Sequence, residues 1–131
     1  MDEAIKTAVS RWLIKAEHDL RTAQTMLSVD PPVTDTACFH AQQCVEKCLK
    51  AYLVAAGVQA ERTHYLPRLV ALCAGQDPEF HKLSDTAAEL TDYAVTDRYP
   101  DNWREIPEAE AQGAVVRALD AMTFVRSRLS L

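Results

Sequence analysis

The chain has 131 residues, which is enough for one domain with a single core and too few for two full-sized domains. Apolar residues make up 48% of it and charged residues 25%, which excludes intrinsic disorder, and no apolar run of about eighteen residues predicts a membrane span. The net charge of -5 repels phosphate groups. Any binding of a nucleotide or nucleic acid must therefore come from a local basic patch.

Composition also favours helices over strands. Three glycines and six prolines leave little turn chemistry for a multi-stranded sheet, whereas strong helix formers are plentiful. The first residues lack the apolar stretch of a secretory signal, so we expect a cytoplasmic protein whose thiols stay reduced. Four cysteines are expected as buried thiols: Cys38, Cys44, Cys48 and Cys73.

The first helix is predicted over residues 3–29, where apolar residues recur at intervals of three and four. Pro31 and Pro32 end it because each removes a backbone donor. Its predicted inward residues are Val9, Trp12, Leu13, Ala16, Leu20, Ala23 and Leu27.

The second helix is predicted over residues 36–56, with Thr34 or Asp35 as its N-terminal cap and Gly57 as its C-terminal stop. Its predicted inward residues are Cys38, Ala41, Val45, Cys48, Leu49, Tyr52, Leu53 and Ala56. The opposite arc is where chemistry could take place, and it carries Phe39, His40, Gln43, Glu46, Lys47 and Lys50.

The second half predicts a short helix over residues 66–74, a longer one from Pro78 to about residue 97, capped by Asp77, and a last one that opens at Pro107. The buried face of the last helix is predicted as Val115, Leu119, Met122 and Val125. Short connections favour antiparallel neighbours, so the expected fold is all-α, a single domain over residues 1–131 forming an antiparallel four- to five-helix up-and-down bundle.

Three segments together resemble the signature of the HEPN domain family: FHAQQCVEKCLKAYLVAAGV at 39–58, THYLPRLV at 63–70 and YAVTDRYPD at 93–101. Their order and spacing also match, and the likeness extends from WLIKAEHDLRTA in the first helix to the last helix. The resemblance implies a helical bundle that often forms a dimer and often has a small nucleotidyltransferase protein as its neighbour. In several branches of the family it implies a toxin-type ribonuclease.

The sequence departs from the ribonuclease branches at their central motif, an Arg followed four to six residues later by His near the end of the bundle. No histidine follows Arg98, since the last one is His81. Arg11 and His18 match the spacing formally, but they lie at the opposite end of the chain and are expected to be solvated. We therefore assign no catalytic residue.

The candidate nucleotide-binding residues are His40, Gln43, Lys47, Lys50, His64, Arg98 and Tyr99. A structural alternative remains for several of them. His64 could cap or hydrogen-bond the third helix, and Arg98 could pair with a neighbouring aspartate. Lys47 and Lys50 could be solvated charges that bridge to Glu46.

Stacking on a base and metal binding are weaker hypotheses. Tyr99 and Trp103 are more typical of a hydrophobic plug that fixes the last loop. His40, Cys44 and Cys48 form a line down one helix, but three ligands on one straight helix cannot surround a metal tetrahedrally. We expect no metal and no cofactor.

The function expected from residues and resemblance is a HEPN-like domain that binds a nucleotide or a nucleotidyltransferase partner, forms a homodimer and serves in a toxin–antitoxin type system. One alternative is a metal-independent endoribonuclease toxin, acting on RNA with a divergent set such as His64, Arg98 and Lys47. Another is a pure protein-interaction module. No membrane partner is expected.

Overall fold

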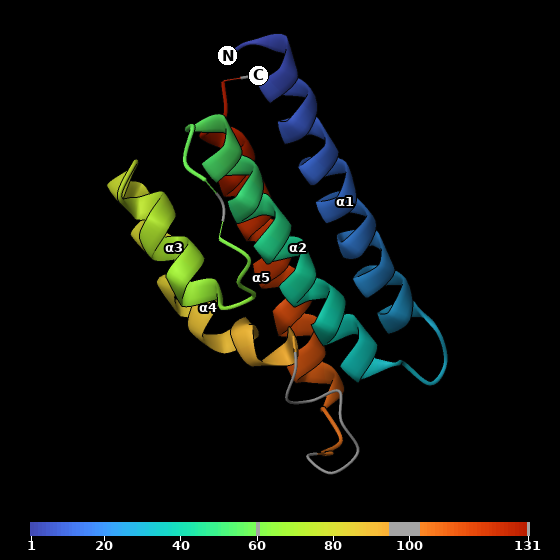
Figure 1. The fold of residues 1–131 in the computed structure, drawn as a ribbon. Coiled ribbons are helices and arrows are strands. Elements are labelled where there is room, and N and C mark those ends of the chain that lie inside the picture. Colours follow the sequence, from blue (N-terminus) through green and yellow to red (C-terminus); the bar gives the residue numbers. More distant parts are fainter. Residues whose placement is uncertain (60, 95–102, 131) are drawn as a thin grey trace.

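The computed structural model describes residues 1–59, 61–94 and 103–130, and within them all regular structure is helical (Figure 1). The elements in chain order are α1 (Glu3–Ser28), α2 (Thr34–Ala55), α3 (Leu66–Ala74), the 3₁₀ helix η1 (Pro78–Leu83), α4 (Ser84–Leu90), the 3₁₀ helix η2 (Thr91–Ala94) and α5 (Glu108–Ser127). The predicted helical bundle is confirmed. None of the described helices is long and apolar enough to span a bilayer.

The long helices α1, α2 and α5 form the body of the bundle, and α1 runs antiparallel to α2 (Figure 1). Asp2 caps α1, since its carboxylate accepts a hydrogen bond from the Ile5 amide at 2.8 Å. The cap predicted for α2 is wrong: the helix already begins at Thr34, and Val33 occupies the N-cap position without a side-chain bond. Gly57, at a φ of 73°, ends the turn after α2 as predicted.

The connection between α2 and α3 returns alongside α2 rather than turning tightly (Figure 1). Gln42 Nε2 donates to the His64 carbonyl at 3.1 Å, so the end of the connection lies beside the middle of α2. Further along, Cys73 of α3 donates its thiol to the Leu49 carbonyl at 3.6 Å. The later residue of α2, Leu49, thus contacts the later residue of the following segment, Cys73, so α3 runs in the same direction as α2.

The core is built from aliphatic side chains, Phe80, Tyr93 and the four cysteines, which are all buried and free as expected. Burial raises the pKa of the Cys73 thiol to about 12. Three of the four residues predicted to be buried on α5 are buried, namely Val115, Met122 and Val125, and the alanines Ala111, Ala114, Ala118 and Ala121 are buried beside them. The prediction is wrong for Leu119, which is 44% exposed. Ala56, just beyond the end of α2, is exposed as well, and Trp12 is only half-buried.

The helix predicted from Pro78 to about residue 97 is a chain of three shorter elements, η1, α4 and η2. Asp77 does cap its start, accepting from the Glu79 amide at 3.1 Å. Residues 95–102, which include the predicted turn at Arg98 and Tyr99, lie outside the described residues.

The two leucines Leu49 and Leu119 test this packing. We expect Leu49→Ala, at a fully buried position, to lower the free energy of unfolding by about 3 kcal/mol. The matched Leu119→Ala should change it by less than about 0.5 kcal/mol. Urea denaturation followed by circular dichroism measures both, and equal losses would mean that Leu119 packs inward after all.

Candidate functional site

A carboxylate on α1 ties two side chains of α2 together. Asp19 is almost buried, and its Oδ1 lies 2.8 Å from Nδ1 of His40. Its Oδ2 accepts a hydrogen bond from Lys47 Nζ at 2.5 Å. His40 and Lys47 are half-buried and seven residues apart, so they lie on one face of α2. The ammonium of Lys47 supplies the countercharge that a buried carboxylate needs.

A second carboxylate, Glu46, forms a similar cluster one turn along α2. Its Oε2 accepts from Lys50 Nζ at 3.0 Å, and its Oε1 lies 2.9 Å from Nδ1 of His64. Glu46 and Lys50 are both buried, and the Lys50 ammonium also lies 5.7 Å from the centre of the Trp12 ring. The His64 side chain is 66% exposed, so it presents the outer surface of this cluster.

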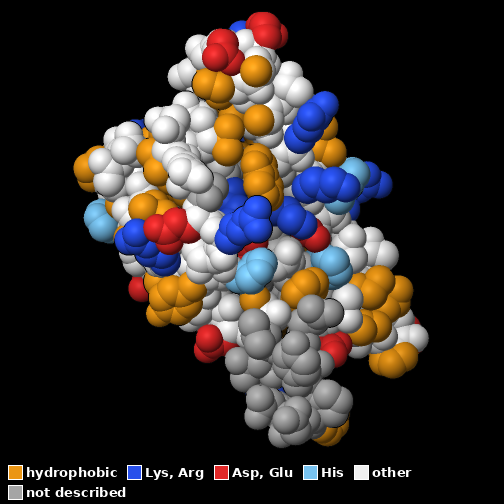
Figure 2. Space-filling view, viewed as in Figure 1, with side chains coloured by type: hydrophobic (Ala, Val, Ile, Leu, Met, Phe, Trp, Pro, Cys, Tyr) orange, Lys and Arg blue, Asp and Glu red, His pale blue; other side chains and the backbone are white. Residues whose placement is uncertain are grey.

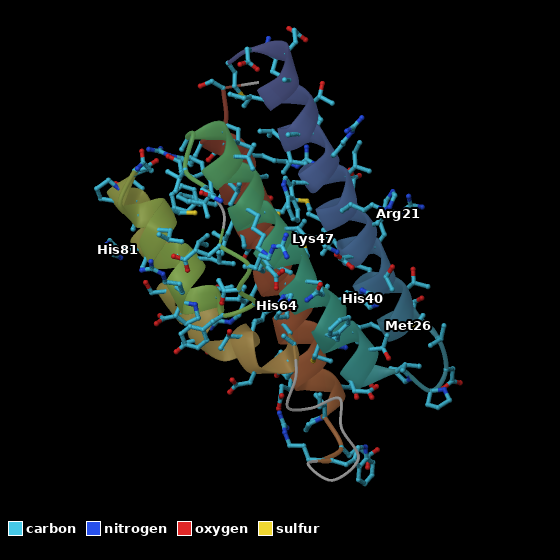
Figure 3. The ribbon with its side chains drawn as sticks, viewed as in Figure 1. Arg21, Met26, His40, Lys47, His64 and His81 are labelled. Atoms are coloured by element: carbon cyan, nitrogen blue, oxygen red, sulfur yellow. The ribbon has the colours of Figure 1, made fainter. Side chains whose placement is uncertain are left out.

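The two imidazoles share one chemical arrangement. In both His40 and His64 the Nδ1 atom faces a carboxylate, which favours the proton on Nδ1 and leaves Nε2 directed away from that carboxylate. A neutral imidazole held in this way accepts a proton at Nε2, and an imidazolium donates one there to an anion. Figure 3 shows His40, Lys47 and His64 on the same side of the molecule. We call these three residues the His–Lys face.

The structure brings together four of the predicted residues, His40, Gln43, Lys47 and His64. Gln43 is half-buried and donates to Gln42 at 2.7 Å. Their neighbour Lys50 lies beneath this surface, with its ammonium bonded to Glu46. Arg98 and Tyr99 lie outside the described residues.

Two structural alternatives need correction. Lys50 does bridge to Glu46, but neither is solvated, because α1 and the connection before α3 cover this part of α2. Lys47 pairs with Asp19 instead of Glu46. Trp103 is 66% exposed, so it does not act as a hydrophobic plug among the described residues.

Asp19 and Gln42 are functional candidates that the sequence reasoning missed. Asp19 falls three residues after Ala16 and four before Ala23, both of which are buried, so an acidic residue occupies a position of the apolar stripe. Gln42 is fully buried and bonds to the His64 carbonyl and, at 3.4 Å, to Glu46. A polar residue in register with an apolar stripe is the signal that could have found both.

A separate cluster is formed by Tyr93, Arg104 and Glu110, which precede and follow the segment 95–102 in the chain. Arg104 forms two hydrogen bonds to the Glu110 carboxylate, at 2.7 and 3.1 Å, and the Tyr93 hydroxyl donates to the same carboxylate. The hydrogen bonds from Arg104 lower the pKa of the Glu110 carboxyl below its usual value of 4.5, and the hydrogen bond from Tyr93 adds a smaller effect in the same direction. Burial, reinforced by Glu110, raises the pKa of Tyr93 well above 10.0.

The lowered pKa of Glu110 gives a pH dependence with a defined sign. A carboxyl whose pKa is lower in the folded state stabilises the fold above its unfolded pKa, and this stabilisation is lost as the pH falls through the folded value. We therefore expect Glu110→Gln to lower the free energy of unfolding by about 1 kcal/mol at neutral pH and by much less near pH 3. Urea denaturation at both pH values measures the difference, with Glu105→Gln as the exposed control. A loss that does not change with pH would contradict the assignment.

The buried pair of Glu46 and Lys50 gives a second test of the site. We expect Glu46→Gln to lower the free energy of unfolding by about 3 kcal/mol, because the Lys50 ammonium then stays buried without a countercharge. Adding Lys50→Met should recover most of this loss. Glu61→Gln, which removes an exposed partner of Arg68, should have little effect in the same denaturation assay. A double variant no more stable than Glu46→Gln alone would argue against the pair.

The described residues form a helical bundle with charged side chains buried between α1 and α2, and comparisons with known proteins identify its family. The HEPN domain model matches residues 9–128, and the chain belongs to this family. It is similar to the crystal structure of TT1696 from Thermus thermophilus, with 32% identity and a TM-score of 0.77 over 92% of this chain and 98% of that one. It is also similar to ST0689, an archaeal HEPN homologue, with 25% identity and a TM-score of 0.71 over 92% and 96% of the two chains. No curated protein matches the sequence.

Proposed function

We propose that this HEPN domain binds a nucleotide at the His–Lys face. The observation that carries the proposal is the pair of imidazoles, His40 and His64, each held through Nδ1 by a carboxylate and accompanied by Lys47. An ammonium and two ring nitrogens are the groups that bind phosphate oxygens through charge-assisted hydrogen bonds.

Preorganisation supports this role. Asp19 and Glu46 fix the imidazoles before any ligand arrives, so little side-chain entropy is lost on binding. Each carboxylate also has a lysine as its countercharge, so protonation of either histidine leaves its cluster with a positive charge. The half-buried amide of Gln43 adds a group that can bond to a base or sugar.

The wider setting that we propose follows from family resemblance. The domain acts in the cytoplasm as a homodimer, beside a small nucleotidyltransferase protein in a toxin–antitoxin type system. Nucleotide binding by this domain and nucleotide handling by that partner are chemically compatible activities.

Thermal unfolding in the presence of nucleotides tests the binding. We expect ATP, GTP or one of their monophosphates to raise the melting temperature by several degrees, because a ligand that binds only the folded state stabilises it. Lys47→Gln should weaken the binding about tenfold, since one charge-assisted contact is lost. The shift is compared within each variant, with Lys6→Gln as the matched control on α1. No shift with any nucleotide, together with a co-purifying partner, would instead favour a pure protein-interaction module.

A metal-independent endoribonuclease is the second candidate, and the same imidazoles favour it. Cleavage through the RNA 2′-hydroxyl needs a base, an acid and a cation, and His40, His64 and Lys47 supply these types. It ranks second because the late Arg-to-His motif is missing. Cleavage of total RNA by the purified protein in a chelator, abolished by His64→Asn or Arg98→Ala, would replace the binding role with a catalytic one.

A further inference from the structure

The charges of the two carboxylate clusters cancel before any ligand binds. Asp19 pairs with Lys47, and Glu46 pairs with Lys50, so two carboxylates face two ammonium groups. Figure 2 shows Lys, Arg and His side chains gathered in the middle of this side of the molecule, but the lysines of the two clusters are already neutralised. While both histidines are neutral, the His–Lys face therefore has little net charge with which to attract a phosphate.

Other charged groups near the two histidines do not supply the missing positive charge. Asp35, in the first turn of α2, lines a hollow of about 270 Å³ together with His40, and its negative charge favours the imidazolium further. In the connection that carries His64, Glu61 pairs with Arg68 at 2.7 Å. Among the described residues, neither imidazole bonds to a charged group other than its own carboxylate.

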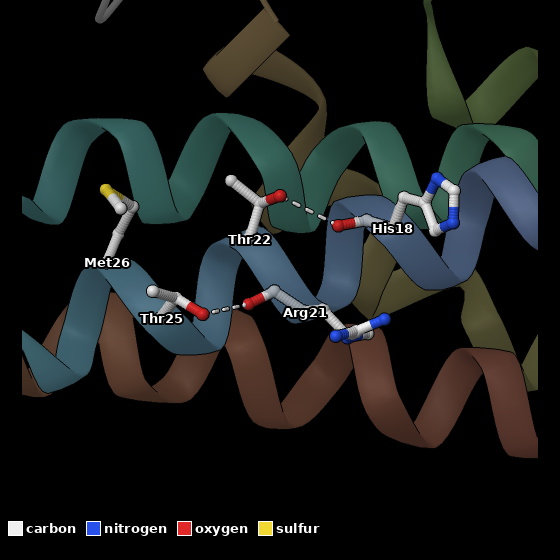
Figure 4. Close-up of a pocket in the computed structure, with 5 residues that line it drawn as sticks. All are labelled: His18, Arg21, Thr22, Thr25 and Met26. Atoms are coloured by element: carbon white, nitrogen blue, oxygen red, sulfur yellow. Dashed lines mark hydrogen bonds between the residues drawn. The ribbon is translucent and has the colours of Figure 1, made fainter.

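The carboxylate contact distinguishes these two histidines from the other two of the chain. Nδ1 of His40 and Nδ1 of His64 lie 2.8 and 2.9 Å from their carboxylates. The rings of His18 and His81 are exposed and bond to no described residue. His18 instead borders a hollow of about 490 Å³ on the outer side of α1 (Figure 4). A fixed Nδ1 is thus a property of the His–Lys face alone.

This geometry determines when Nε2 can bind a phosphate. A neutral imidazole carries one proton, and the carboxylate favours its location on Nδ1. Nε2 then has only a lone pair to offer, and a phosphate oxygen is itself an acceptor. An imidazolium has a proton on both nitrogens, so it can donate to phosphate from Nε2 and keep its bond to the carboxylate. Binding of a phosphate through Nε2 therefore requires a second proton on each ring.

We propose that phosphate binding at the His–Lys face is coupled to the uptake of two protons, one by His40 and one by His64. The inference rests on the proposed function and adds the regulation of the same site: the ligand is bound as the pH falls and released as it rises. The protons come from the solvent and add to the Nε2 lone pairs, and no covalent bond is broken. Two added positive charges match the two negative charges of a terminal phosphate monoester, as in AMP, better than the single charge of a phosphodiester.

Isothermal titration calorimetry with AMP between about pH 7.5 and 8.5 tests the coupling, because the phosphate of AMP is a dianion throughout this range and most imidazoles are neutral. We expect the affinity to fall by about 10- to 100-fold over this interval, since each proton taken up contributes up to about tenfold per pH unit. Titrations in two buffers with different enthalpies of ionisation count the protons directly, and about two per AMP are expected. Cyclic AMP, a phosphodiester, should bind at least about tenfold more weakly.

A lysine in place of one histidine separates the proton from the charge. Lysine stays protonated over this range. His64→Lys should therefore lower the count to about one proton per AMP, reduce the pH dependence to at most about tenfold, and bind AMP more tightly than the unaltered protein at about pH 8.5. The matched control is His81→Lys, which adds the same charge at an exposed position of η1 far from the His–Lys face (Figure 3) and should leave the count at about two.

Binding of AMP without proton uptake would overturn the coupling and leave the proposed function intact, since Nε2 would then accept a hydrogen bond from a sugar or base. Equal effects of His64→Lys and His81→Lys, or cyclic AMP that binds as tightly as AMP, would also overturn it. So would nitrogen NMR of the free protein at about pH 8.5 that locates the imidazole proton of His40 or His64 on Nε2. Absence of binding by every nucleotide would instead overturn the proposed function together with this inference, so the two failures remain distinguishable.

Discussion

The pairing of buried carboxylates with lysines is the constraint on which the rest of this structure depends. Asp19 and Glu46 are removed from water, and an isolated carboxylate in such a place would be too costly to keep ionised. Lys47 and Lys50 make their burial tolerable. Aliphatic contacts between α1 and α2 could be made at several rotations of the helices, but the bonds of Asp19 to His40 and Lys47 are satisfied at only one. These bonds, which cross from α1 to α2, therefore specify how the two helices are rotated, even if a hydrophobic replacement were equally stable.

The same bonds determine where the chemistry lies. Glu46 reaches across to His64, and Gln42 binds the carbonyl of that residue, so the return connection before α3 is held against the middle of α2. Without these contacts the connection would be an exposed loop with no reason to bring a histidine near Lys47. A network that satisfies buried polar groups thus also delivers an imidazole to the surface in a fixed orientation. The same hydrogen bonds therefore stabilise the fold and position the candidate site.

Much of the fold could be predicted from the sequence because helix periodicity and stop signals are local. Gly57 ends the turn after α2 and Asp77 caps the start of η1, as their chemistry requires, and the four cysteines are buried as expected for reduced thiols. The failures depend on neighbours. Leu119 is as apolar as Val115 beside the same stripe, and only the close fit of the α5 alanines decides which of them turns outward. Partners 28 residues apart, such as Asp19 and Lys47, leave no local pattern either.

The positions of the charged side chains show most clearly what the sequence alone does not predict. Asp19 and Arg21 are two residues apart, and a count of charges along the chain cancels one against the other. In the helix about 200° of rotation separates them, so the carboxylate faces α2 and the guanidinium faces solvent. Once Asp19 is neutralised by Lys47, it no longer offsets the cations on the outer face of α1. A net charge of -5 is therefore compatible with a surface that attracts phosphate, because the sum over the sequence ignores which charges have already been paired inside.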